Sequence, residues 1–216
     1  MLRALLFGVM AATVAAAGAD ADALLTLEHR VNLADPGWRD LAGAFATRPA
    51  SVVSVFEERR WFSFKKTPTV LKGIARVSAE HGLSLEYGGP EPRTVIIDTR
   101  GMLVREAGRD TAPPADARAT AANIALLHLL RFDLPRLAET FQLYGVRQGE
   151  AWRLAFVPIA EPVRRALGHI AVAGEGPRVR RIELRRSATQ RVEILVEPPR
   201  AEGAGFTADE LRRYFR

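Results

Sequence analysis

The sequence contains no cysteine. This absence excludes structural disulfides, thiolate metal sites, a cysteine nucleophile and a lipid-modified N-terminal cysteine. Lysine is also scarce, because only Lys65, Lys66 and Lys72 occur among the 31 basic residues. The net charge of +6 is modest for 216 residues, and the basic residues are spread along the chain. This distribution argues against nucleic-acid binding, which gathers basic residues on one helix or beside stacking aromatics.

Motifs for catalysis and metal binding are absent from the sequence. The histidines are far apart and form no His-Glu-x-x-His pattern, and no nucleophile elbow, P-loop or dinucleotide-binding glycine motif occurs. Glu57 and Glu58 are adjacent, and neighbours on a strand point to opposite faces, so the two carboxylates cannot act on one bond. We therefore expect no enzymatic activity, no cofactor and no metal site.

Only one long apolar run occurs, and it lies at the N-terminus. Arg3 precedes an apolar segment over residues 4–16, and Ala17-Gly18-Ala19 forms a small-residue cleavage site before Asp20. This pattern predicts a cleavable secretory signal peptide over residues 1–19. The run is shorter than the roughly 20 residues of a membrane-spanning helix. We expect an exported, soluble chain with a single domain over residues 20–216.

The spacing of apolar residues predicts a domain that is mainly β with some α. Alternating segments with a turn signal about every ten positions are typical of antiparallel strands. The predicted strands are residues 51–60, 70–77, 83–87, 94–98, 102–105, 152–156, 169–173, 179–185 and 191–196. The predicted helices are residues 20–34, 38–46, 116–131, 133–141 and 207–215. A capping box of Thr207 and Glu210 begins the last helix.

Alternation also predicts which side chains face the interior of the sheet. Such residues fill the core of a closed β-protein, or they line an apolar hollow when a barrel is wide or incomplete. An empty apolar hollow needs a lid, and the helix that carries Leu127 and Leu130 is the candidate. The candidate lining and lid residues are Phe56, Ile74, Leu83, Leu85, Tyr87, Ile97, Leu103, Leu127, Leu130, Trp152, Leu154, Phe156, Ile182 and Leu184.

Arginines are frequent between residues 178 and 191. Two interpretations remain open: a solvated outer face, or a docking surface for an anionic lipid or an acidic partner. Arg180 and Arg185 are the candidate docking residues in the second interpretation.

Several short motifs follow one another between residues 51 and 106. They are Val52-x-Ser54-x-Phe56-x-Glu58, Lys72-Gly73-Ile74-Ala75-Arg76-Val77, Leu83-x-Leu85-x-Tyr87, Pro90-Glu91-Pro92, Val95-Ile96-Ile97-Asp98 and Gly101-Met102-Leu103-Val104. In this order they resemble the LolA-like family of periplasmic outer-membrane lipoprotein carriers. The segment 56–61 and Glu91-Pro92-Arg93 are similar to a LolA-related subgroup found beside pigment or lipid-like biosynthesis genes.

The resemblance implies an incomplete, strongly curved antiparallel β-barrel of about eleven strands, with helices covering its open side. It also implies a periplasmic carrier that shelters acyl chains of lipoproteins or lipid-like cargo in a hydrophobic cavity. Such a carrier receives cargo from an inner-membrane donor and passes it to an outer-membrane acceptor, with transient membrane contact. The alternative is an accessory protein of an envelope lipid or aryl-polyene-type pathway that hands on an acyl intermediate. We expect a monomer in either case.

One departure from the family pattern concerns gating. Carriers of the main family have an Arg-Pro pair just after the second strand, and that arginine is tied to opening and closing of the cavity. Here the corresponding residues are Ala79 and Glu80. The resemblance therefore does not carry the gating mechanism over to this chain.

Overall fold

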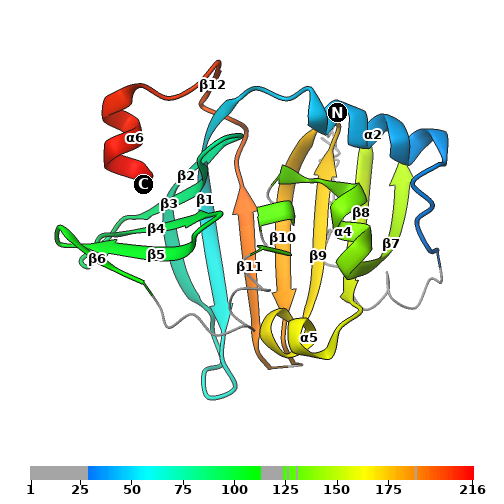
Figure 1. The fold of residues 1–216 in the computed structure, drawn as a ribbon. Helices are drawn as coiled ribbons and strands as arrows, with labels where there is room; N and C mark the ends of the chain where they lie inside the picture. Colours follow the sequence, from blue (N-terminus) through cyan, green and yellow to red (C-terminus); the bar gives the residue numbers. More distant parts are fainter. Residues whose placement is uncertain (1–28, 113–123, 126, 130, 188) are drawn as a thin grey trace, which may run out of the picture.

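A single twelve-stranded sheet dominates the computed structural model (Figure 1). The structure describes residues 29–112, 124–125, 127–129, 131–187 and 189–216, so the expected signal peptide lies outside the described residues. The strands are β1 (Ser51–Trp61), β2 (Thr69–Ser78), β3 (Gly82–Tyr87), β4 (Arg93–Asp98), β5 (Gly101–Glu106), β6 (Arg109–Thr111), β7 (Phe141–Gln148), β8 (Ala151–Pro158), β9 (His169–Glu175), β10 (Arg178–Arg185), β11 (Arg191–Val196) and β12 (Ala201–Gly203). The helices are α2 (Pro36–Ala46), α4 (Leu134–Thr140), α5 (Glu161–Leu167) and α6 (Ala208–Tyr214).

Two antiparallel meanders join at the centre of the sheet. The strand order is β6-β5-β4-β3-β2-β1-β11-β10-β9-β8-β7, and β12 pairs with the first residues of β1 beyond the end of β11. The edge strands β6 and β7 do not pair with each other, so the sheet is curved but open (Figure 1). This architecture confirms the predicted fold class, an incomplete antiparallel barrel that is mainly β with α.

The predicted N-terminal helix is wrong for its described part, residues 29–34. Val31 donates its backbone N–H to the carbonyl of Leu143, and His29 accepts from the N–H of Gly145, both on the edge of β7. An edge strand offers unpaired backbone groups, and satisfying them overrides the weak helical spacing of this segment. Residues 20–28 of that predicted helix lie outside the described residues.

Strands β6, β7 and β12 and helix α5 are absent from the predictions. Gly145 interrupts the alternation of β7, and a Cβ atom there would lie 2.8 Å from the ring of Trp38 and 2.7 Å from Leu154. The glycine therefore marks a close approach of α2 to the sheet rather than a break in the strand. Two predicted caps are confirmed: Asp133 accepts from the N–H of Arg136, and Thr207 forms a capping box with Glu210.

One half of the concave face is filled with packed side chains. Helices α2, α4 and α5 lie over β7, β8 and β9 (Figure 1). Phe45 of α2 stacks on Phe132 with ring centroids 3.8 Å apart, and both rings contact Trp152 of β8. We call this region the packed half. Its buried residues are Leu41, Phe45, Ala125, Leu129, Phe132, Leu134, Leu137, Phe141, Leu143, Trp152, Leu154, Phe156, Val163, Leu167, Ile170 and Val172.

A smaller cluster occupies the concave face of β1 to β4. Phe56, Tyr87, Leu83 and Ile97 are its largest members from the strands, and Leu127 packs against them from the segment that precedes α4. This cluster and the packed half are separate groups of contacting residues. The space between them contains the candidate site.

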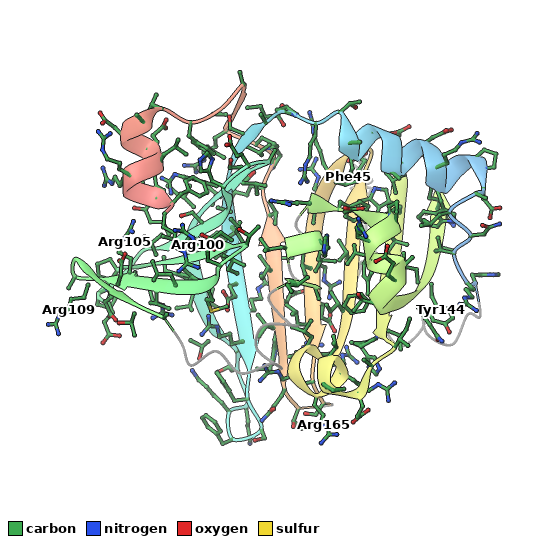
Figure 2. All side chains as sticks on the ribbon, in the orientation of Figure 1. Phe45, Arg100, Arg105, Arg109, Tyr144 and Arg165 are labelled. Carbon is green, nitrogen blue, oxygen red and sulfur yellow. The ribbon has the colours of Figure 1, made fainter. Side chains whose placement is uncertain are left out.

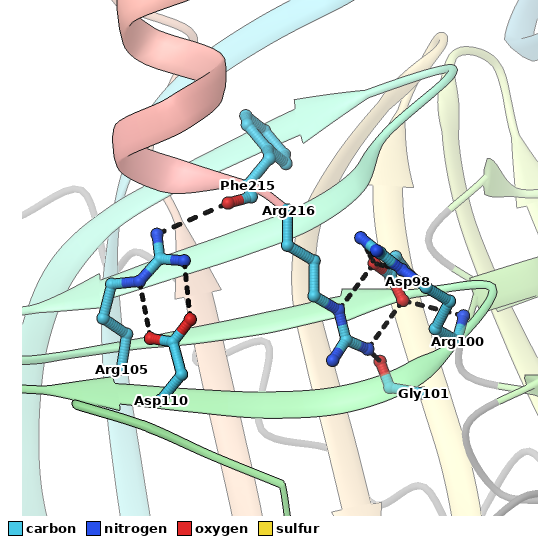
Figure 3. A network of polar contacts seen from close by, with 7 residues as sticks. All are labelled: Asp98, Arg100, Gly101, Arg105, Asp110, Phe215 and Arg216. Carbon is cyan, nitrogen blue, oxygen red and sulfur yellow. Dashed lines mark hydrogen bonds and ion pairs between the residues drawn. The ribbon is translucent and has the colours of Figure 1, made fainter.

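Helix α6 covers the opposite, convex side of the sheet, near β2 to β5 (Figure 1). The guanidinium of Arg76 lies 3.4 Å from the ring centroid of Tyr214. Arg216 donates two hydrogen bonds of 2.8 Å to the carboxylate of Asp98, and Arg105 donates to the carbonyl of Phe215 at 3.4 Å (Figure 3). The prediction that the helices cover the open side therefore holds for α2 and α4 but not for α6.

The Asp98 network makes stability depend on pH. Burial raises the pKa of Asp98, but hydrogen bonds from Arg216 and Arg100 outweigh it and lower the pKa from 3.8 to about 2. A lowered folded-state pKa contributes stability that is present above pH 3.8 and is lost as the pH falls toward 2. Between pH 5 and pH 2, we expect the wild type to lose about 2 kcal/mol more of its unfolding free energy than Asp98→Asn. Urea unfolding at several pH values measures this difference, and parallel profiles would contradict it.

Candidate functional site

A partly open cavity of about 460 Å³ lies on the concave face between the packed half and the β1–β4 cluster. Its walls come from strands of both meanders, from the C-terminal end of α2 and from Leu129. The lining residues are mostly aliphatic: Ala44, Phe45, Thr47, Arg48, Pro49, Val52, Ser54, Phe56, Ala75, Val77, Leu83, Leu85, Ile97, Leu129, Val172, Pro177, Arg178, Val179, Arg180, Ile182, Leu184, Ile194, Val196, Glu197, Pro199 and Glu202. The cavity is thus an apolar hollow within the size range of small-molecule sites.

The cavity exists because small side chains occupy the centre of the sheet. Ser54 of β1 is directly paired with Ala75 of β2, and both face the cavity. Larger residues surround the pair, because Leu85 is the partner of Ala75 on β3 and Phe56 follows Ser54 on the same face of β1. Since the side chains of Ser54 and Ala75 are both small, this part of the concave face stays unfilled.

A buried polar group lies next to the aromatic end of the cavity. The ring of Phe56 packs over Gly73 and meets Tyr87 edge to face, with centroids 5.2 Å apart. Glu58, which is 3% exposed, accepts hydrogen bonds from the hydroxyl of Tyr87 and from Arg60. Burial and the neighbouring Glu58 carboxylate raise the pKa of Tyr87. The phenol therefore stays protonated and donates its hydrogen to Glu58.

Charged residues collect at the other end of the cavity, where β1 begins. We call this group the rim; its members are Arg48, Arg178, Arg180, Glu197 and Glu202. The antiparallel register places the β9–β10 turn and the start of β1 at the same end of the sheet. Burial, and secondarily the charge of Arg131, lower the pKa of Arg48. The rim therefore combines both signs of charge, whereas the deeper lining is apolar.

The structure brings six of the predicted lining residues together around the cavity: Phe56, Leu83, Leu85, Ile97, Ile182 and Leu184. Tyr87 and Leu127 belong to the adjoining β1–β4 cluster, and Trp152, Leu154 and Phe156 lie in the packed half. Leu130 lies outside the described residues.

Ile74 and Leu103 belong to the opposite side of the sheet from the cavity. Ile74 is the neighbour of the cavity residue Ala75 along β2 and is paired with Val55. Leu103 is paired with Ile96, which is the neighbour of the cavity residue Ile97 along β4. Successive strand residues point to opposite faces, so the assignment of Ile74 and Leu103 to the lining is corrected here.

Several cavity residues are missing from the predictions. Phe45 comes from the end of a helix, and its approach to the sheet leaves no signal in strand periodicity. Ser54 is polar, so the alternation pattern alone does not mark it as a lining residue. Ala75, Ile194 and Val196 each have an apolar neighbour, Ile74 or Leu195, so alternation with polar residues does not assign them to one face either.

Arg180 and Arg185 do not form one surface. Arg180 lies at the rim, with a bulge between Val179 and Arg181 that shifts the register of β10. Arg185 donates to Glu183 at 2.9 Å, on the strand face that also carries Arg181. Further ion pairs continue this charged row across β11 and β1, joining Arg181 to Glu193, Glu193 to Arg59, and Arg59 to Glu57. Arg180 and Arg185 therefore lie on different faces of β10, and docking through either of them stays a prediction.

The described residues offer neither a metal site nor a membrane-spanning helix. Among the described residues, no group of three or more histidine, aspartate or glutamate side chains is placed to hold a metal ion. Likewise, none of the helices within the described ranges is both long and apolar enough to cross a bilayer.

Solved structures with a related arrangement of strands include two bacterial proteins. One is a LolA superfamily protein from Nitrosomonas europaea, with 7% sequence identity over 80% of this chain and 95% of that chain, and a TM-score of 0.43. The other is a putative outer membrane lipoprotein-sorting protein domain from Vibrio parahaemolyticus, with 8% identity, the same coverage and a TM-score of 0.41.

Comparison by sequence finds no relatives of this kind. No protein-family model matches the sequence, and no curated protein sequence matches it either. At the identities and TM-scores above, the two solved structures carry no argument about what this chain binds.

Proposed function

We propose that the protein is a carrier that holds the hydrocarbon chain of a lipid or an acylated protein in its cavity, without chemistry. The observation that supports this proposal is the apolar hollow of about 460 Å³ in a concave face that is otherwise packed. Its deeper lining offers aliphatic carbon rather than paired polar groups, so it suits a guest without directional hydrogen bonds.

The size of the hollow makes a guest energetically useful. Buried cavities destabilise proteins by about 24 cal/mol per Å³, so an enclosed void of 460 Å³ would cost on the order of 10 kcal/mol. The cavity is partly open, which makes this figure an upper bound. A domain is stable by only about 5–15 kcal/mol in total, so a chain that fills the space contributes substantially to the folded state.

The same arithmetic explains why loading and release can both occur. Each buried methylene contributes about 0.8 kcal/mol, in the cavity as in a bilayer. A carrier therefore needs only to match approximately the free energy that the chain gains by burial in the bilayer. The donor and acceptor proteins then set the direction of transfer. We place this cycle in the periplasm, with an acylated lipoprotein or lipid-like cargo, an inner-membrane donor and an outer-membrane acceptor.

Binding of an environment-sensitive probe tests this proposal. We expect bis-ANS to bind the purified protein saturably and to brighten, because the apolar cavity excludes water from the dye. A long-chain fatty acid should displace the dye with a stoichiometry of one, whereas a short-chain acid of equal charge should not. Dye binding that does not saturate, or equal displacement by both acids, would argue against an acyl-chain site.

A further inference from the structure

The hairpin between β1 and β2, residues 62–68, carries the most exposed aromatic side chain of the described residues. Phe64 is 85% exposed, although exposing a phenylalanine ring to water is unfavourable relative to burying it. Phe62 stacks against it, with ring centroids 5.4 Å apart and an interplanar angle of 20°. The two rings therefore form a preformed apolar tip at the end of the hairpin, which projects beyond the sheet (Figure 1).

The charge around this tip has one sign. No aspartate or glutamate occurs between residues 59 and 79, and all three lysines of the chain lie on this hairpin or its strands. Lys72 is paired with Glu57 further along the strands. Lys65 donates to the hydroxyl of Thr69, and among the described side chains no carboxylate pairs with Lys65 or Lys66. The aromatic tip is thus flanked by two uncompensated cations.

Neighbouring elements extend the basic character of this end of the molecule. The β10–β11 turn lies beside the hairpin, because the guanidinium of Arg191 sits 4.0 Å from the ring centroid of Trp61. Helix α5 ends against the same turn, since a Cβ on Gly168 would lie 2.1 Å from the carbonyl of Arg185. This end also carries α5, on which Arg164 and Arg165 (Figure 2) share the single carboxylate of Glu161, and the exposed Ile159 precedes that helix.

We propose that this hairpin is a docking element for the surface of an anionic lipid bilayer. Phe62 and Phe64 enter the boundary between headgroups and acyl chains, and Lys65 and Lys66 contact lipid phosphates. Aromatic rings beside lysines match the two attractions that hold peripheral proteins at such a surface, apolar burial and charge. A projecting tip also suits a bilayer better than a protein partner, because it offers no concavity for a partner to fill.

The proposed docking does not depend on what the cavity binds. β1 rises about 3.3 Å per residue over its 11 residues, so the hairpin and the rim are roughly 30 Å apart at opposite ends of this strand. A protein docked through the hairpin would therefore keep the rim clear of the bilayer. Failure of the docking proposal would leave the carrier proposal untouched, and the reverse also holds.

Co-sedimentation with vesicles tests the docking element. We expect the protein to bind vesicles of phosphatidylglycerol and phosphatidylcholine far better than vesicles of phosphatidylcholine alone. Each lysine near an anionic surface contributes about fivefold in affinity, so Lys65→Gln with Lys66→Gln should weaken binding roughly 30-fold. Phe64→Ser should weaken it at least about tenfold, because the apolar contact is lost.

Matched variants separate this element from general charge and apolarity. Arg39→Gln with Arg109→Gln removes the same charge at exposed positions of α2 and β6, and Val70→Thr alters an exposed apolar residue on the strand beside the tip. These variants should bind vesicles within about threefold of the wild type. All hairpin variants should still bind bis-ANS as the wild type does, because the cavity is not altered.

The absence of cysteine allows the depth of insertion to be measured directly. Ser63→Cys introduces a single thiol at the tip for an environment-sensitive fluorophore, and Arg109→Cys provides the same label away from it. Anionic vesicles should shift the emission of the Ser63→Cys conjugate to the blue and leave the Arg109→Cys conjugate unchanged. The proposal is overturned if neither label shifts, if the control pair of arginines weakens binding equally, or if the hairpin binds only an acidic protein and no vesicle.

Discussion

Replacing Ala75 by phenylalanine is expected to weaken acyl-chain binding more than tenfold while leaving the protein folded. Ala75 faces the cavity beside Ser54, so the added ring would project into space that a guest is proposed to occupy. The new ring buries apolar area in a void that already exists, so stability should be unchanged or higher. Displacement of bis-ANS by a fatty acid measures binding, and thermal unfolding measures stability.

Val55→Phe is the matched control for this substitution. Val55 lies on the same strand as Ser54 but faces the convex side, where its partner on β2 is Ile74. The same increase in size at Val55 should leave dye and fatty-acid binding within about twofold of the wild type. Equal binding by Ala75→Phe and the wild type would show that the ligand does not use this cavity.

Replacing Glu58 by alanine is expected to be the most destabilising of the substitutions considered. Glu58 accepts hydrogen bonds from Tyr87 and Arg60, so its removal leaves the buried hydroxyl of Tyr87 without its acceptor and takes the ion-pair partner from Arg60, which is 33% exposed. Leaving a buried hydroxyl without its acceptor costs about 1–3 kcal/mol, and loss of the partly exposed ion pair adds up to about 1 kcal/mol. For a chain of this length, a total of about 3 kcal/mol corresponds to a fall in Tm of roughly 10 °C.

Glu57→Ala tests whether burial is the cause of that loss. Glu57 is adjacent in sequence, but its side chain is 26% exposed and pairs with Arg59 and Lys72 on the convex side. Exposed ion pairs of this kind contribute about 0–1 kcal/mol. Calorimetry of the two variants should therefore show a clear fall in Tm for Glu58→Ala and a small change for Glu57→Ala. Similar falls for both would mean that the burial of Glu58 is not the cause of the loss.

Most of the sheet could be predicted from the sequence because strand alternation is a local property. All nine predicted strands occur, and the motif order from residue 51 to residue 106 corresponds to the meander β1 to β5. The errors fall where long-range contacts decide local structure. Residues 29–31 form backbone hydrogen bonds with the edge of β7, and the ring of Trp38 packs closely against Gly145. Neither interaction produces a periodic pattern in the sequence.

The candidate site was predictable only in part. Periodicity identifies the face of a strand, and Leu83, Leu85 and Ile97 were assigned to the cavity on that basis. It does not tell a filled concave face from a hollow one. Trp152 and Phe156 alternate as regularly as Leu83 and Leu85, yet Phe45 and Phe132 pack the face near Trp152 and leave no cavity there. That difference is decided by helices from distant parts of the chain.

A crystal structure of the protein with a brominated long-chain fatty acid would test the carrier proposal most directly. The bromine positions report the path of the chain without relying on weak density for carbon. We expect the anomalous signal to lie between Ala75 and Ile182, within the cavity and below the charged rim. Bromine found only on the convex face, or a concave face closed by side chains with the fatty acid absent, would contradict the proposal.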